Sequence, residues 1–359
     1  MSGRLGVPGL LAILHRPAGA QDLSGAGWSE LIAAARSSNL LGALAEGLRA
    51  SGVVAPEAAA RHLEGARQLG GRQRLSVRWE AHCLQEALGG LGVPIVLLKG
   101  AAYVLGYPAL AEGRLFGDID ILVPRPALGD VESRLMLAGW SSSSVDAYDQ
   151  RYYRQWMHEL PPMVHVRRGT VLDVHHTILP LSARRSPDPQ AIIERARPVP
   201  GLPGLRVPCP EDLLIHSITH LMHEGELHNG LRDLHDIDRM VARFATVPGF
   251  WPRLVQMAAG SDLAPPVAAG LSLARSILGS KVPLEVLGRL DPGFGWRHRA
   301  VLHAYRCAMR HPTPGRRPWQ AGLAHGLVYL RGHWLRMRPW QLARHLATKA
   351  WKGVLPRPS

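Results

Sequence analysis

The stretch that decides the fold is "RLFGDIDILV", residues 114–123, in which two acids interrupt an otherwise apolar segment. Asp118 and Asp120 alternate with Ile119 and Ile121. This alternation predicts a β-strand with both acids on one face and both isoleucines on the other. Two carboxylates so close together repel each other unless a cation lies between them. The stretch therefore predicts a carboxylate pair suited to Mg²⁺. The simpler alternative is a solvated strand end.

Two other segments supply groups of matching chemistry. "VPIVLLK" ends at Lys99 and is followed by Gly100 and two alanines, which predicts a buried strand and a tight turn into a helix. Such a turn can hold phosphate. "PMVHVRRGTVLDVHHTI" reads as a β-hairpin that turns at Arg168, Gly169 and Thr170, and its second strand carries Asp173 as a third carboxylate with His175 on the same face. Together with Arg114, these residues favour phosphoryl transfer from a nucleoside triphosphate by a two-metal site.

These segments also resemble a known protein family. "LLKGAAYVLGY", "GRLFGDIDILV", "LDVHHTI" and "GLRDLHDIDRMV" occur in this order between about Val93 and Val241. The ordered set is similar to the uncharacterised nucleotidyltransferase family of the DNA polymerase β superfamily. It is more distantly similar to abortive-infection and toxin nucleotidyltransferases that begin with a Lys-Gly-Gly turn. The resemblance implies transfer of a nucleoside monophosphate from an NTP, such as ATP, to a hydroxyl of an unidentified acceptor, with two Mg²⁺ or Mn²⁺ ions.

The resemblance gives each of the three acids a role. It implies that Asp118 and Asp120 bind both metal ions and that Asp173 is the third carboxylate, next to the acceptor hydroxyl. Removing one of two neighbouring like charges relieves repulsion. We therefore expect Asp120→Asn to abolish transfer at little cost in stability.

The nucleotide-binding residues that we expect are Lys99, Gly100, Arg114 and Gly117. Lys99 and Arg114 are expected to neutralise the charge of the triphosphate. In the usual superfamily turn the glycine is followed by Gly or Ser, whereas Gly100 is followed by Ala101. The hydroxyl contact to phosphate is therefore missing, and Lys99 must serve through its charge.

Three residues are accessory candidates. His175 is placed either to orient the acceptor or, in a structural role, to hydrogen-bond the Asp173 carboxylate. Arg232 and Asp236 are four residues apart, so on a helix they can pair with each other. The resemblance places that helix across the cleft from the strands, and an ordinary surface ion pair is the alternative.

A cluster of histidines raises a second functional class. His216, His220 and His223 fall on one face of an expected helix, and His235 is followed directly by Asp236. Adjacent His and Asp ligands are typical of metal-dependent phosphohydrolases. The structural alternative is an amphipathic helix pair with hydrogen-bonded histidines.

The excess positive charge is concentrated at the end of the chain. The net charge is +14, and after Asp291 there are thirteen Lys and Arg, five Trp and no acid. This basic tail favours contact with RNA or an anionic membrane, and a non-catalytic binding protein is the third functional reading. The alternative is that its tryptophans pack on the core while arginines face water.

The order of patterns predicts an α+β protein. We expect N-terminal helices over 1–91, a small mixed-sheet core like that of polymerase β over 92–208, and a helical C-terminal domain with the basic tail over 209–359. Three scattered cysteines indicate a reducing, cytoplasmic location. No stretch reaches the roughly 18 uninterrupted apolar residues of a membrane span, so peripheral contact is the membrane association we expect.

Overall fold

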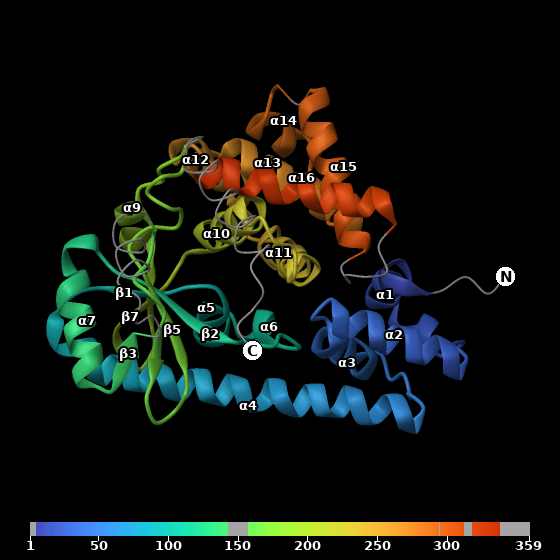
Figure 1. Ribbon diagram of the computed structural model, residues 1–359, viewed down its shortest axis with the longest axis horizontal. Helices are drawn as coiled ribbons and strands as arrows, with labels where there is room; N and C mark the ends of the chain where they lie inside the picture. The colour runs from blue at the N-terminus through green and yellow to red at the C-terminus, as the bar shows by residue number, and fades with distance from the viewer. Residues whose placement is uncertain (1–4, 143–156, 294, 312–317, 338–359) are drawn as a thin grey trace, which may run out of the picture.

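The computed structural model describes residues 5–142, 157–293, 295–311 and 318–337. It is an α+β structure with one seven-stranded mixed sheet and many helices before and after it, which confirms the expected fold class. In Figure 1 the sheet lies toward one end of the molecule, and the C-terminal helices lie above it.

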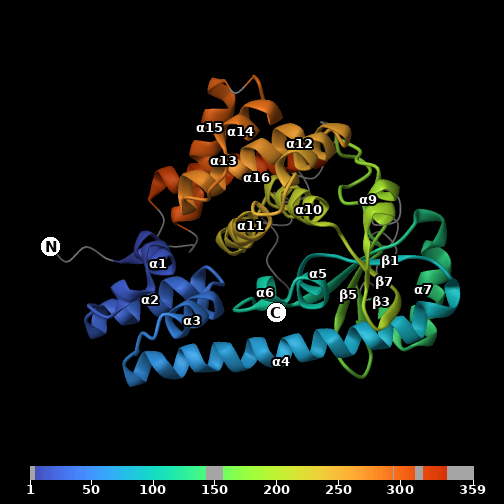
Figure 2. The same ribbon diagram turned by 180° about the vertical axis from the view of Figure 1, so that it is seen from behind.

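The N-terminal segment is helical, as its apolar periodicity predicts. It contains α1 (Gly6–His15), α2 (Gly25–Ser37), α3 (Leu41–Ala50) and α4 (Glu57–Leu88). Buried residues of α4 recur every three or four positions, among them Val77, Ala81, Leu84 and Leu88. α4 runs beneath both the small N-terminal helices and the sheet (Figures 1 and 2).

The sheet has the strand order β3-β4-β5-β2-β1-β7-β6. Its strands are β1 (Ile95–Leu97), β2 (Asp118–Leu122), β3 (Trp140–Ser142), β4 (Met163–His165), β5 (Val171–His175), β6 (Arg197–Val199) and β7 (Leu202–Val207). β2 lies between antiparallel β1 and parallel β5. The predicted β2 strand and the predicted β4–β5 hairpin are confirmed.

Short helices connect the strands. They are α5 (Lys99–Gly106), α6 (Pro108–Ala111), α7 (Leu128–Leu137) and α9 (Pro189–Arg195). The expected turn after β1 is present, although the strand ends at Leu97 and Lys99 already begins α5.

The described part of the chain after β7 is helical. Its helices are α10 (Pro210–His223), α11 (Gly230–Phe244), α12 (Phe250–Gly260), α13 (Ala264–Leu278), α14 (Leu284–Leu290), α15 (Trp296–Arg310) and α16 (Trp319–Arg336). α10 and α11 lie above α5 in both views (Figures 1 and 2). None of the helices in the described ranges combines the length and apolar composition that a membrane crossing requires.

Two polar side chains of α4 fix the strands that carry the acids. The Gln73 amide donates to the Phe116 carbonyl at 2.6 Å and accepts from the Phe116 amide at 3.0 Å, just before β2. Glu80, only 3% exposed, accepts two hydrogen bonds from Arg168 and one from Thr170, in the turn between β4 and β5. Because buried polar groups need partners, these contacts hold β2 and β5 against the same helix.

Candidate functional site

The three predicted carboxylates meet on adjacent strands. Asp120 and Asp173 are directly opposite each other in the parallel β2–β5 register, and Asp118 lies at the start of β2. Carboxylate oxygens of the three residues lie within 4.8 Å of one another. Asp118 is exposed, Asp173 is half-buried and Asp120 is 2% exposed. The group is open to solvent on the Asp118 side.

Asp120 is held by two cationic or polar groups. Lys99 Nζ lies 2.7 Å from Asp120 Oδ1, and His175 Nε2 lies 3.0 Å from the same oxygen. Burial opposes ionisation of Asp120, but the charge of Lys99 and the hydrogen bond from His175 outweigh it and hold the pKa well below its usual value. Asp120 is therefore ionised and paired. The small stability cost expected for Asp120→Asn does not follow, because the substitution leaves Lys99 and His175 without their acceptor.

The turn that carries Lys99 is tightly packed. Lys99 has a φ of +40°, a left-handed conformation that is uncommon for lysine. The next residue must be small, because a Cβ added to Gly100 would lie 2.5 Å from the Phe116 ring. The predicted nucleotide-binding residue Gly100 is thus also required for close packing of α5 against the segment before β2. Gly117, also predicted to bind nucleotide, is exposed next to Asp118.

Asp173 has the environment of a cation ligand. Its Oδ1 is buried and has no hydrogen-bond partner within the described ranges. Burial raises the pKa of Asp173 to about 7, and the negative charges of Asp120 and Glu159 add to the shift. A divalent cation at the carboxylate group would satisfy the orphaned oxygen and offset the repulsion. The donor set of carboxylate oxygens fits Mg²⁺ or Mn²⁺.

Two residues that we did not predict, His158 and Glu159, complete the polar surroundings. Glu159 Oε2 lies 3.2 Å from His175 Nδ1, and the His158 ring stacks on His175 at 5.1 Å. The expected hydrogen bond from His175 to Asp173 is wrong, since the imidazole instead bridges Glu159 and Asp120. Burial lowers the pKa of His175, but these two partners raise it overall. The sequence signal that could have identified these two residues is the His-Glu pair itself, shortly before the β4–β5 hairpin.

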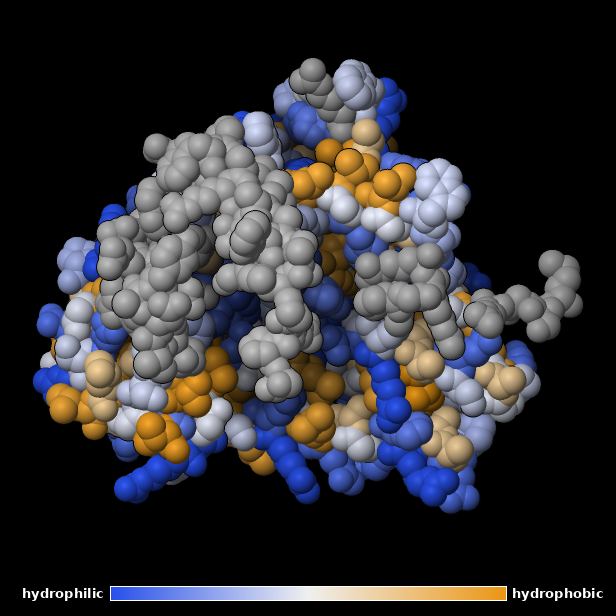
Figure 3. All heavy atoms as spheres, in the orientation of Figure 1, coloured by the Kyte–Doolittle hydropathy of each residue, from blue (hydrophilic) through white to orange (hydrophobic). Residues whose placement is uncertain are grey.

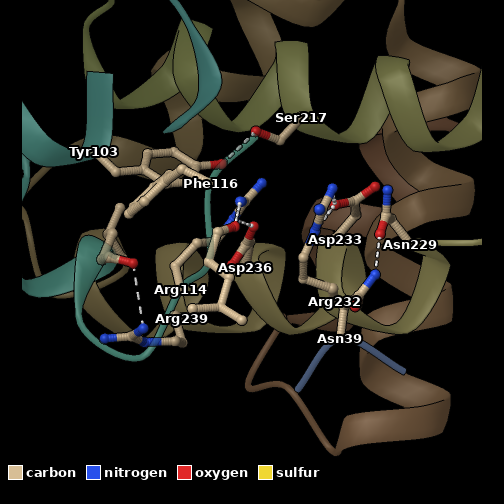
Figure 4. Close-up of polar contacts among 12 residues, drawn as sticks. Asn39, Tyr103, Arg114, Phe116, Ser217, Asn229, Arg232, Asp233, Asp236 and Arg239 are labelled. Carbon is tan, nitrogen blue, oxygen red and sulfur yellow. Dashed lines mark hydrogen bonds and ion pairs between the residues drawn. The ribbon is translucent and has the colours of Figure 1, made fainter. Parts of the chain in front are cut away.

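Arg114 lies between the sheet and α11. Figure 4 shows its guanidinium turned toward Asp236, with Nε 2.5 Å from Oδ2. Both side chains are buried, at 9% and 6% exposure. Arg114 also lies 5.7 Å from the Tyr103 ring centroid and 5.5 Å from that of Phe116. The Arg114 guanidinium is therefore engaged by protein groups from α5, the segment before β2 and α11.

The predicted pairing of Arg232 with Asp236 is wrong. Arg232 donates two hydrogen bonds to Asp233, at 2.9 and 2.7 Å (Figure 4). Asp236 faces the buried side of α11, where Arg114 is the cation within reach. Because a buried carboxylate requires a partner, tertiary packing rather than helix spacing selects the pair.

The histidines of α10 form no metal-binding group with one another in the described part of the chain. His216 is buried, and its pKa is lowered to about 3 by burial and by the nearby charges of Lys99 and His175. His220 faces Glu224, and His223 Nδ1 lies 2.9 Å from the Thr219 carbonyl. In the described part of the chain, the groups of three that could bind a metal are Asp118, Asp120 and Asp173, and His158, Glu159 and His175. The histidine set expected for a phosphohydrolase is therefore not brought together there.

The basic tail is partly described. Trp340 and Trp351 lie outside the described residues. Trp296, Trp319 and Trp334 are 69%, 72% and 43% exposed. For these three the alternative of tryptophans packed on the core is wrong.

A mixed sheet that presents three carboxylates on neighbouring strands, beside a lysine at a strand-to-helix turn, defines a protein of the phosphoryl-transfer class. The family model described as uncharacterised nucleotidyltransferase matches residues 24–279, and the chain belongs to this family. Membership implies nucleotidyl transfer from an NTP to an acceptor. No curated protein and no solved structure matches the chain.

Proposed function

We propose that this nucleotidyltransferase moves a nucleoside monophosphate from an NTP to a hydroxyl of its acceptor, with Asp118, Asp120 and Asp173 holding two Mg²⁺ ions. The observation that carries the proposal is the meeting of three carboxylates within 4.8 Å, one of which has a buried oxygen without a hydrogen-bond partner among the described residues. The ions, when bound, would neutralise the triphosphate and stabilise the attacking and leaving oxygens.

The chain's own residues have separate roles in this reaction. The acceptor oxygen forms a bond to the α-phosphorus while the bond to pyrophosphate breaks. Asp173 is placed to receive the hydroxyl proton, because it lies opposite Asp120 in the β2–β5 register and its buried Oδ1 has no hydrogen-bond partner among the described residues. Lys99 supplies positive charge at the turn and holds Asp120. Glu159 positions Asp120 through His175.

Arg114 receives a different role from the one the sequence predicted. Its buried ion pair with Asp236 joins the segment before β2 to α11. We propose that it is a positioning residue that keeps β2 in place below the helices, and that Lys99, Gly100 and Gly117 remain the nucleotide-binding residues. The base of the NTP and the identity of the acceptor are open to direct measurement.

The test is nucleotide transfer itself. The purified chain is incubated with each α-labelled NTP, Mg²⁺ and a cell extract, and the labelled product is identified. We expect Asp118→Asn and Asp173→Asn to lose transfer by about a hundredfold or more, as for removal of a catalytic group. Asp173→Asn should still bind the Mg²⁺ complex of the NTP through the other two acids.

A matched control is Asp130→Asn, which makes the same chemical change at an exposed position of α7. It should transfer nucleotide at the parent rate. Parent-level transfer by Asp118→Asn would refute the carboxylate assignment. Loss of NTP binding in Asp173→Asn would give Asp173 a structural role instead.

We also propose that the basic tail contacts a polyanion, RNA or an anionic membrane. The thirteen cations without an acid after Asp291 support this proposal. Affinity for either partner should fall steeply as salt rises, because bound counterions are released.

A further inference from the structure

The outer face of α16 is apolar over its whole length. Its exposed large side chains are Trp319, Leu323, Leu327, Leu330 and Trp334, with exposures of 72%, 60%, 60%, 45% and 43%. Spacings of four, four, three and four residues place them in one stripe along the helix. In Figure 3 hydrophobic side chains gather over α16, in the upper part of the face shown. We call these five residues the α16 stripe.

The stripe contains no charge. The other exposed residues of α16 are Gln320, Gly322 and Gly326, so no charged side chain of this helix is exposed. A solvated helix face normally carries charged and polar residues. Contiguous exposed apolar surface of this kind marks an interaction site.

The opposite face of α16 is already occupied by the protein. Ala321, Ala324 and Val328 are buried on it, and Arg331 donates to the Met222 carbonyl of α10 at 2.7 Å. At the end of the helix, Ser182 donates to the Arg336 carbonyl at 2.6 Å. These contacts fix the orientation of α16, so its stripe faces outward in the folded molecule.

Positive charge near the α16 stripe favours an anionic partner. Arg184 is exposed and lies 4.2 Å from the Trp334 ring centroid. The stripe also belongs to the final 68 residues, which contain thirteen cations and no acid. Two copies of such a surface would repel each other, which disfavours self-association. Between its two terminal tryptophans, the stripe presents three leucines that offer no aromatic face for stacking with successive RNA bases.

We propose that the α16 stripe docks on an anionic lipid surface. The leucines would enter the boundary between headgroups and acyl chains, the terminal tryptophans would lie at headgroup depth, and Arg184 beside Trp334 would contact lipid phosphate. This refines the proposed polyanion contact of the basic tail by naming the surface and the partner. It is independent of the catalytic proposal, because α16 lies outside the family match.

The experiment measures binding of the full chain to vesicles. Sedimentation is compared for vesicles of phosphatidylglycerol mixed with phosphatidylcholine and for vesicles of phosphatidylcholine alone, at low and moderate salt. The variant is Leu323→Gln/Leu327→Gln, which changes polarity without changing charge. We expect binding to the anionic vesicles to weaken about tenfold or more, because each leucine loses its burial in the bilayer.

The matched control is Leu284→Gln, since Leu284 on α14 is 68% exposed and lies outside the stripe. It should bind as the parent does. A second variant, Trp319→Phe/Trp334→Phe, keeps the apolar character of the stripe. With brominated lipid, the parent's tryptophan fluorescence should be quenched, and this variant should lose most of the quenching. This readout remains informative if the glutamine variant does not fold.

Four results would overturn the proposal. In the first two, the parent does not bind anionic vesicles, or the parent and the glutamine variant bind them equally. In the third, the parent is a dimer and the variant is not. In the fourth, the variant weakens binding of polyuridylate as much as it weakens binding of vesicles. The dimer would assign the stripe to a second copy, and the polyuridylate result would assign it to RNA. Pyrophosphate release from NTP, measured in parallel, tests the catalytic proposal separately.

Discussion

Asp120 is a proposed metal ligand, and its buried contacts also stabilise the fold. Its carboxylate is buried, and it accepts contacts from Lys99 and His175. We predict that Asp120→Asn abolishes transfer and lowers the free energy of unfolding by about 3 kcal/mol, because it breaks a buried ion pair. Urea denaturation measures the stability change.

Asp118→Asn is the matched comparison, since Asp118 lies on the same face of β2 but is exposed. It should also abolish transfer, while stability changes by at most about 0.5 kcal/mol. Equal stability of the two variants would show that the contacts of Asp120 with Lys99 and His175 do not stabilise the fold.

Asp173 links the stability of the metal-free protein to pH. Its pKa is about 7 in the folded chain, above the value of roughly 3.9 for an unfolded aspartate. The folded state therefore holds a proton that the unfolded state has released, and the resulting stabilisation is complete below about pH 4. It is lost as the pH rises through about 7. We predict that Asp173→Asn reduces the fall in melting temperature between about pH 5 and pH 8.

Mg²⁺ should reverse part of that loss. At about pH 8 the ion would replace the missing proton at the carboxylate group, so it should raise the melting temperature of the parent more than that of Asp173→Asn. The same pH slope and the same Mg²⁺ response in both proteins would mean that Asp173 titrates normally and is not a ligand.

Among the elements, β2 and α11 are joined by a buried ion pair. Arg114 precedes β2, and Asp236 lies on α11, 122 residues later in the chain. We predict that Arg114→Met and Asp236→Leu each lower the free energy of unfolding by about 3–5 kcal/mol, because each leaves a buried charge unpaired. The double variant should recover most of that loss, as an apolar pair can replace a buried ion pair. A urea-denaturation cycle gives the coupling energy.

Activity of the double variant separates the two roles considered for Arg114. If Arg114 is a positioning residue, transfer should be retained once stability is restored. If Arg114 binds the triphosphate, the stable double variant should show a raised KM for NTP. If each single variant lowers the free energy of unfolding by less than about 1 kcal/mol, the Arg114–Asp236 ion pair is screened by solvent.

For the molecule as a whole, one hydrophobic core crosses the three expected segments. Buried apolar residues from Val7 to Val328 form one cluster. α4, before the sheet, supplies Gln73 and Glu80 to the strands. We therefore propose that 1–91, 92–208 and 209–359 are regions of one cooperative unit. The chain should unfold in a single urea transition, coincident by circular dichroism and tryptophan fluorescence.

Expression of 92–208 alone provides the complementary measurement. Without α4 and the C-terminal helices, this region exposes the apolar surface that they cover, and we expect it not to fold. Two separated transitions in the full chain, or a folded 92–208 fragment, would show that the regions are independent domains.

The amino-acid sequence by itself determined what depends on periodicity and on local chemistry. Alternation in "GDIDILV" placed Asp118 and Asp120 on one face of a strand, because successive side chains of a strand point to opposite sides. The turn at Lys99, the β4–β5 hairpin and the helices on both sides of the sheet follow from equally local patterns. The ordered motifs also identified the nucleotidyltransferase family.

Only the tertiary structure decided which distant groups become partners. Asp236 pairs with Arg114, and His175 with Asp120 and Glu159, because burial requires each charge to find a partner within reach. Spacing along the chain carries no information about that reach. For α16 the sequence is apolar on both sides, so periodicity could not tell the face that packs on α10 and α15 from the face left to solvent. The tertiary packing of the chain determines which face of α16 is buried and which is exposed.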